Sequence, residues 1–168
     1  MFAHNTDYEN ALAFSRFDSS HFLSTHSPHG FELENQHWPS VEHYYQASKF
    51  GNTQYGQRIL QASSPEEAFK LGNVWWRRKR ADFKTVRKTL MTRALYSKAV
   101  QNEAIAAALL DTAEQLILEN SSYQHYWGIG RDQRGDNQLG KIWMDIRQKL
   151  RAKKADNDPL ANGSQLGE

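Results

Sequence analysis

Helix start and stop signals recur along residues 39–154 and constrain the fold more than any other feature of this chain. The clearest is Ser64-Pro65-Glu66-Glu67, with Ser at N-cap, Pro at N1 and Glu at N3. This capping box predicts a helix that ends near Gly72. Further helices are predicted over 40–49 with Ser40 as cap, over 53–62, from a cap at Asp82 onward, over 102–111, and in a last segment that ends near 154.

Strand signals are few and short. Residues 22–38 alternate apolar and polar side chains, as in Phe31-Glu32-Leu33-Glu34, and Gln115–Glu119 is typical of another short strand. We therefore predict an α+β fold: a predominantly helical single domain with a small N-terminal antiparallel sheet, spanning residues 15–154. Residues 155–168 contain three acids and no Lys or Arg, without apolar periodicity, and are expected to form a disordered tail.

Composition excludes several classes of protein. The chain has no cysteine, so a thiol nucleophile and Cys-ligated metal sites are excluded. Its seven histidines are scattered, and we expect no metal site. No apolar run is long enough to span a bilayer and the N-terminus does not resemble a signal peptide, so we expect a cytoplasmic protein without a membrane partner. The sequence predicts no oligomeric state.

Three polar residues share one direction on the helix that begins after Ser40. At 100° per residue, Glu42, Gln46 and Lys49 form a narrow stripe. The stripe is either a solvated face with a weak Glu–Lys pairing, or the lining of a cleft in which Glu42 is a base or charge stabiliser and Lys49 anchors an anion.

A glycine-rich loop, Tyr126–Gly140, precedes the last helix. Four glycines and two arginines suit a backbone that approaches a ligand closely, although such loops are more often simple turns, and Asn137 is as well suited to cap the helix as to contact a ligand. No Walker or Rossmann fingerprint is present.

A basic segment follows two tryptophans. Residues 77–88 contain seven Lys or Arg and one acid, next to Trp75 and Trp76. The segment suits a phosphate or a nucleic-acid backbone with bases stacked on the rings, or else it is a solvated helix entry. With Tyr126, Trp127 and the rings around Glu42, these tryptophans are expected to converge on one cleft.

The run Trp38–Phe50 resembles the W-P-[ST]-x-E-H-x-x-Q-A-x-K-F signature of the NADAR family. Further matches occur in family order over about 22–150: Phe22-Leu23-Ser24, Ser63-Ser64-Pro65, Gly72, Met91 with Ala94-Leu95, Tyr126–Gly130, and Gly135-x-Asn137-x-Leu139-Gly140 with Met144 and Arg147.

The resemblance implies an N-glycosidase, a hydrolase that needs no cofactor. Some members hydrolyse the ribose C1–N bond of phosphorylated ribosylamino-pyrimidine intermediates of riboflavin biosynthesis and release ribose 5-phosphate. Others remove ADP-ribose from nucleic-acid bases, which would make nucleic acid a partner. A third interpretation is a non-catalytic module that binds ADP-ribose or a nucleotide.

The resemblance also implies roles for particular residues. Glu42 would stabilise the developing positive charge or activate water. The substrate contacts would come from Trp127 and Phe83 on the base, Lys49 and Arg80 on the phosphate or sugar hydroxyls, Gln46 and Asn137 as orienting groups, and Gly128 in a loop that closes over the substrate.

Three positions depart from the family pattern. Gln124 stands where relatives can carry Asp, Ile129 where they can carry an acid, and Phe83 where they can carry Trp. A second carboxylate would then come from Asp82, Asp132 or Asp136, or its role would pass to water.

Overall fold

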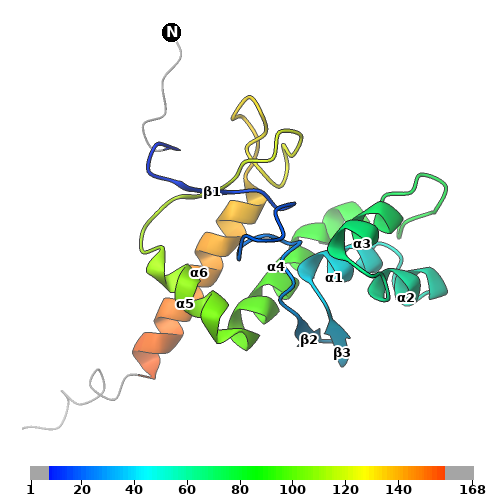
Figure 1. Cartoon of the computed structure of the whole chain (residues 1–168), viewed down its shortest axis with the longest axis horizontal. Coiled ribbons are helices and arrows are strands. Elements are labelled where there is room, and N and C mark those ends of the chain that lie inside the picture. The colour runs from blue at the N-terminus through cyan, green and yellow to red at the C-terminus, as the bar shows by residue number, and fades with distance from the viewer. Residues whose placement is uncertain (1–7, 158–168) are drawn as a thin grey trace, which may run out of the picture.

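A computed structural model describes residues 8–157 of the chain. Within this range the order is β1 (Leu12–Phe14), β2 (Phe31–Leu33), β3 (Gln36–Trp38), α1 (Val41–Ser48), α2 (Gln54–Leu60), α3 (Pro65–Gly72), α4 (Phe83–Gln101), α5 (Glu103–Asp111), β4 (Ile117–Glu119) and α6 (Gln138–Asp156) (Figure 1). The predicted α+β fold, predominantly helical with small sheets, is confirmed.

The predicted capping signals act at the starts of α1 and α3. The Ser40 hydroxyl accepts the His43 N–H at the start of α1, and the Ser64 hydroxyl accepts the Glu67 N–H at the start of α3. The Glu67 carboxylate in turn accepts the Ser63 N–H at 2.6 Å. At α4 the prediction needs correction: Asp82 occupies the N-cap position, but its carboxylate is held by Arg80 and makes no capping hydrogen bond.

The strands form two separate pairs. β2 and β3 are antiparallel, with Phe31 opposite Trp38, and their turn places Glu34 and Asn35 at a φ of 58°. This hairpin is the predicted N-terminal antiparallel sheet. β1 pairs in parallel with β4, which lies within the predicted 115–119 strand.

The ends of the domain differ slightly from the predicted bounds. β1 begins at Leu12, before residue 15, because it pairs with β4. α6 runs to Asp156, so the first residues of the predicted tail are helical. The rest of that tail, from 158 on, lies outside the described residues.

Helix α1 is the centre of the domain. It packs against α2, α3 and α4, and seven of its eight residues are buried, so it has no solvated face. α4 runs behind α1, and α6 lies on the far side of α4 beside α5 (Figure 1); these two helices of 19 residues each contribute buried side chains such as Met91, Leu95 and Trp143. Every group that α1 carries is therefore held by packed neighbours.

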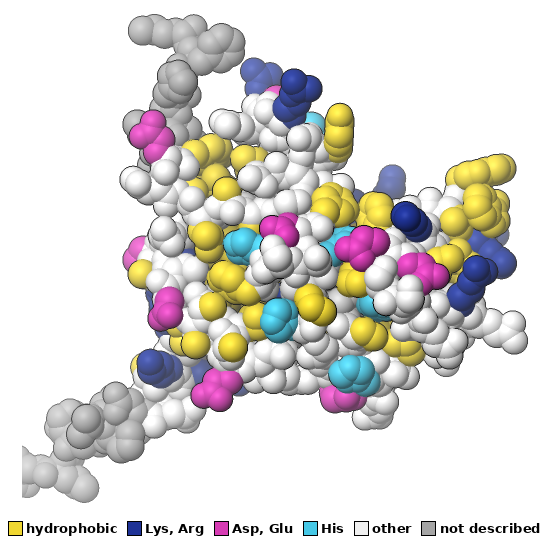
Figure 2. All heavy atoms as spheres, in the orientation of Figure 1, with side chains coloured by type: hydrophobic (Ala, Val, Ile, Leu, Met, Phe, Trp, Pro, Cys, Tyr) yellow, Lys and Arg dark blue, Asp and Glu magenta, His cyan; other side chains and the backbone are white. Residues whose placement is uncertain are grey.

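The loop between α3 and α4 projects from the molecule. It carries Trp75 and Trp76, whose exposed fractions are 89% and 63%, and Figure 2 shows hydrophobic side chains beside Lys and Arg at this end. The expectation that these two rings converge with the others is therefore wrong.

No helix within residues 8–157 is long and apolar enough to cross a bilayer.

Candidate active site

Glu42 lies in the first turn of α1 with its carboxylate completely buried. Its backbone N–H donates to the Thr25 carbonyl at 3.0 Å, which fixes this end of the helix against the 15–27 loop. A buried carboxylate needs several donors to offset its lost hydration.

Four side chains surround the Glu42 carboxylate. The Arg16 guanidinium donates to Oε1 at 3.1 Å and to Oε2 at 2.9 Å. The Thr25 hydroxyl donates to Oε2 at 2.6 Å, and the Gln46 amide donates to Oε1 at 2.5 Å. His26 Nδ1 lies 3.4 Å from Oε2. We call these five residues the Glu42 cluster.

The cluster keeps Glu42 ionised. Burial raises the pKa of this carboxyl group, but the charge of Arg16 and then that of His26 act in the opposite direction. Hydrogen bonds from Gln46 and Thr25 add to them, and the pKa of Glu42 is lowered to about 2. At neutral pH Glu42 is therefore a carboxylate anion shielded from water and paired with the Arg16 guanidinium, in a position to interact with a cation that forms beside it.

The predicted polar stripe exists, and it is buried. Gln46 and Lys49 are 1% and 5% exposed, which excludes the solvated face. The Lys49 ammonium donates to the Gly72 carbonyl at 3.2 Å and to Asn73 Oδ1 at 3.0 Å. Burial, with the charge of Lys79 added, lowers the pKa of Lys49 to about 7.

An aromatic group borders the stripe. The Tyr45 ring lies 5.6 Å from that of Trp127 and 5.5 Å from that of Phe83, and the Lys49 ammonium lies within 6 Å of the Tyr45 and Phe83 rings. Trp127 is only 4% exposed, since Tyr126 packs against its other side. The structure thus brings Trp127, Phe83 and Lys49 together, as the sequence predicts.

A cavity of about 580 Å³ opens beside the Glu42 cluster. Its wall includes Phe17, whose ring contacts the His26 ring at 5.2 Å and the Arg16 guanidinium at 5.4 Å. Phe69 and Gln124 also line it, so the residue that replaces a family Asp faces this cavity. The cavity adjoins the cluster through Phe17, and no residue of the Glu42 cluster itself lines it.

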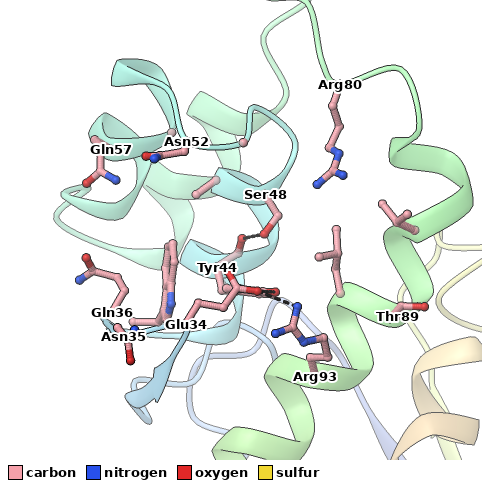
Figure 3. A pocket seen from close by; sticks show the side chains of 16 residues that line it. Glu34, Asn35, Gln36, Tyr44, Ser48, Asn52, Gln57, Arg80, Thr89 and Arg93 are labelled. Carbon is pink, nitrogen blue, oxygen red and sulfur yellow. Dashed lines mark hydrogen bonds and ion pairs between the residues drawn. The ribbon is translucent and has the colours of Figure 1, made fainter.

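Arg80 is placed differently from the other predicted contacts. Its backbone N–H donates to the Lys49 carbonyl at 2.8 Å, but its side chain pairs with Asp82 and lines a second cavity of about 680 Å³. That cavity adjoins Tyr44 and Ser48 (Figure 3), which at 100° per residue point in other directions from α1 than Glu42 does. A role for Arg80 in the same site as Glu42 stays a prediction.

Asn137 and Gly128 hold the glycine loop against β4. Asn137 Oδ1 accepts the Glu119 N–H at 3.0 Å and its amide donates to the Ile117 carbonyl at 2.9 Å. A Cβ on Gly128 would collide with the Glu119 carboxylate, so only glycine fits there. The observed contacts of both residues are structural, and their predicted contacts with substrate stay untested.

The three acids considered as a second carboxylate are all exposed: Asp82, Asp132 and Asp136. Glu119 is instead completely buried, and its Oε1 accepts the Arg16 N–H at 3.0 Å. Sequence reasoning missed Glu119 and also Arg16, Thr25 and His26. The predicted strand 115–119 contains Glu119 and was the only signal of its burial, and the 15–27 loop offered no periodicity.

Comparison with known proteins gives the family. The sequence profile of the NADAR domain matches residues 1–151. The chain belongs to the NADAR family. It is 37% identical over 132 residues to N-glycosidase Npun_R5314 of Nostoc punctiforme, covering 77% of this chain and 85% of that protein. N-glycosidase YbiA of Escherichia coli is 33% identical over 123 residues, covering 73% and 77%.

A longer relative and a solved structure extend this result. Riboflavin biosynthesis protein VVA0006 of Vibrio vulnificus is 34% identical over 143 residues, which are 84% of this chain and 39% of that protein. The NMR structure of E. coli YbiA superposes with a TM-score of 0.79 at 28% identity, covering 89% and 90% of the two chains. Membership of a family that contains N-glycosidases supports the hydrolase class predicted from the sequence.

Proposed function

We propose that the protein is an N-glycosidase that hydrolyses the ribose C1–N bond of a phosphorylated ribosylamino-pyrimidine, an intermediate of riboflavin biosynthesis, and releases ribose 5-phosphate. The observation that carries the proposal is the Glu42 carboxylate, buried completely and kept anionic by Arg16, by hydrogen bonds from Thr25 and Gln46, and by His26 at 3.4 Å.

The charge of Glu42 matches the charge that this reaction develops. Breaking the C1–N bond leaves an oxocarbenium-like sugar, which a nearby carboxylate stabilises in a site without competing water. A carboxyl group with a pKa of about 2 carries no proton at neutral pH, so Glu42 does not protonate the leaving nitrogen. In the balanced reaction, the oxygen of water joins C1 and a proton from water ends on the released amine.

Lys49 supplies the second group; with a pKa of about 7 its ammonium is partly protonated at neutral pH and fully charged below it. It lies seven residues after Glu42 on the same direction of the helix, which is about 10 Å along the axis at 1.5 Å per residue. A cation at that distance suits the phosphate or the sugar hydroxyls while C1 lies near Glu42. Tyr45, Phe83 and Trp127, between and beside these charges, offer apolar ring surfaces to the pyrimidine.

The experiment is a direct assay of the purified protein. The phosphorylated ribosylamino-pyrimidine and an ADP-ribosylated oligonucleotide are incubated separately, and release of ribose 5-phosphate or ADP-ribose is followed by chromatography. Release of ribose 5-phosphate from the first substrate is expected. Absence of turnover with both, together with binding of ADP-ribose, would overturn the proposal in favour of a binding module.

One observation favours the second candidate, removal of ADP-ribose from nucleic-acid bases. The loop with the exposed Trp75 and Trp76 is tied to Lys49 at both ends, through Gly72 and Asn73 on one side and Arg80 on the other. Exposed indoles beside basic side chains suit stacking of single-stranded bases. This function predicts that Trp75→Ser with Trp76→Ser slows turnover of the oligonucleotide but not of the free pyrimidine riboside.

A further inference from the structure

Lys98 lies in the last turn of α4 and its side chain is completely buried. Its ammonium donates to the Phe22 carbonyl at 2.6 Å, to the Ser24 carbonyl at 2.9 Å and to the Ser27 hydroxyl at 2.5 Å. It also lies 5.6 Å from the centre of the Trp143 ring. None of these partners within residues 8–157 is a carboxylate, so a buried cation is held by uncharged oxygens of one short segment, residues 22–27.

The hydrogen bonds of Lys98 fall on both sides of two residues that contact Glu42. The two serines that accept from Lys98 stand directly before Thr25 and directly after His26 in the chain. Between them, Thr25 Oγ1 lies 2.6 Å and His26 Nδ1 lies 3.4 Å from Oε2 of Glu42. While Lys98 holds both serines, the segment has little freedom to move these two groups away from the carboxylate.

The same segment also holds Arg16. The Ser24 hydroxyl donates to the Arg16 carbonyl at 2.5 Å, and the Thr25 hydroxyl approaches the same oxygen at 3.3 Å. Three of the four side chains around the Glu42 carboxylate therefore depend on the segment that Lys98 holds, either directly or through Ser24. The fourth lies on α1 itself.

We propose that Lys98 is a positioning residue for the Glu42 cluster: it holds the 22–27 segment in the conformation in which three partners of the carboxylate reach it. The Lys98 ammonium makes its hydrogen bonds to the segment and not to Glu42, so it acts through the segment. Its effect on turnover rests on the proposed function, whereas its effect on the segment does not. A lysine that only filled the core would change stability and leave the cluster as it is.

The titration of His26 reports the position of the segment. Burial lowers the pKa of His26, and the charge of Glu42 acts in the opposite direction with a smaller effect. Release of the segment from Lys98 would bring the His26 ring into water and weaken its contact with Glu42. Since burial is the larger of the two effects, the pKa of His26 would then rise toward its ordinary value of 6.5.

The first test uses 1H–13C NMR of the ligand-free protein and needs no substrate. We follow the His26 Cε1–H signal and the Thr25 methyl signal in wild type and in Lys98→Met between about pH 5 and pH 8. In Lys98→Met we expect a higher titration midpoint for His26 and a displaced Thr25 methyl signal. Both signals are read only under conditions in which urea unfolding shows the variant to be folded.

Arg147→Met is the matched control. Arg147 is a buried cation of α6 that also holds a loop, through the Thr112 hydroxyl at 2.7 Å and the Gln115 carbonyl at 2.9 Å, but that loop carries no residue of the Glu42 cluster. We expect wild-type His26 and Thr25 signals in this variant, whatever stability it loses.

The second test measures release of ribose 5-phosphate. Lys98→Met is expected to lower kcat about 10- to 100-fold with KM nearly unchanged, because the partners of Glu42 move while Lys49 and the aromatic rings stay in place. Arg147→Met is expected to keep the wild-type kcat. Ser27→Ala removes one acceptor of Lys98 and is a milder variant with a smaller loss of kcat. Combined with Lys98→Met it is expected to cause no further loss.

The outcomes separate this proposal from the proposed function. Wild-type His26 and Thr25 signals in folded Lys98→Met, equal changes in Arg147→Met, or displaced signals with a wild-type kcat would each overturn it. If Lys98→Met does not fold, Ser27→Ala decides alone, and unchanged signals there overturn the proposal. Displaced signals in a protein whose wild type shows no turnover would retain the positioning role and refute only the proposed function.

Discussion

An Arg–Glu ion pair lies on each of two sides of helix α1, and one pair is buried while the other is exposed to water. Arg16 and Glu42 meet at 2.9 Å with side-chain exposures of 3% and 0%, while Arg93 and Glu34 meet at 2.6 Å with exposures of 46% and 49%. The distances alone would rank the second pair as the stronger. Burial decides otherwise, because water screens the exposed pair and leaves the buried charges dependent on each other.

This contrast explains why the cluster side is suited to catalysis. A carboxylate that water cannot reach is not screened by solvent, so the part of its field that Arg16 does not offset acts on a positive charge that develops beside it. Glu34, half exposed, has no such effect.

The largest expected effect on stability comes from removing the guanidinium of the buried pair. Arg16→Gln leaves Glu42 charged and buried without its main partner, and we expect a loss of about 3–5 kcal/mol in the free energy of unfolding. Arg93→Gln removes the matched guanidinium of the exposed pair and is expected to cost less than about 1 kcal/mol. Urea unfolding at pH 7 measures both, and equal losses would refute the contrast.

The titration of Lys49 is a second test of the difference between buried and exposed charges. With a pKa of about 7 in the fold, Lys49 loses its proton above pH 7, whereas the unfolded chain keeps that proton to about pH 10. The unfolded state therefore binds more protons in this window, and stability rises with pH by up to about 1.4 kcal/mol per pH unit from this residue.

Lys49→Met is expected to reduce that rise. Burial also lowers the pKa of Lys98 to about 7, so Lys98 still contributes its own part of the rise in stability with pH in this variant. Urea unfolding at pH 7, 8 and 9 gives the slope, with the exposed Lys84→Met as control. An identical slope in wild type and Lys49→Met would show that Lys49 does not titrate in this range.

The smallest expected effect is the one on substrate binding by Trp127, one of the rings beside the Glu42–Lys49 stripe. Trp127→Phe keeps an aromatic ring but reduces its stacking surface, and we expect KM to rise about tenfold with little change in kcat, in line with about 1–3 kcal/mol per stacked base. Trp143→Phe changes a completely buried tryptophan of α6 that is not among the predicted substrate contacts, and controls for lost core packing. Wild-type KM and kcat in Trp127→Phe would reject its contact with the base.

Part of this site was predictable from the sequence. Helical periodicity placed Glu42, Gln46 and Lys49 on one direction because all three lie on one helix, and the Gln115–Glu119 pattern located β4. The partners of Glu42 were not predictable, since Arg16, Thr25 and His26 come from a loop without periodicity. That loop is positioned by the β1–β4 pair and by Glu119, which is 103 residues from Arg16.

The directions in which loop side chains point could not be predicted from the sequence either. Lys49 and Arg80 are joined through their backbones, yet their side chains leave toward opposite sides of α1. Asp82 shows the same effect at a helix start: a good cap residue was diverted by the arginine two positions before it. Local competition between partners, which no spacing rule records, decided both cases.

Glu42 is the group proposed to stabilise the transition state, and one kinetic comparison tests this role most directly. Glu42→Gln and Glu34→Gln are assayed for release of ribose 5-phosphate from the phosphorylated ribosylamino-pyrimidine, each first shown to be folded by its urea transition. We predict that Glu42→Gln lowers kcat by about 10²–10³ with KM nearly unchanged, and that Glu34→Gln keeps the wild-type kcat. A Glu42→Gln protein that retains the wild-type kcat would contradict the account.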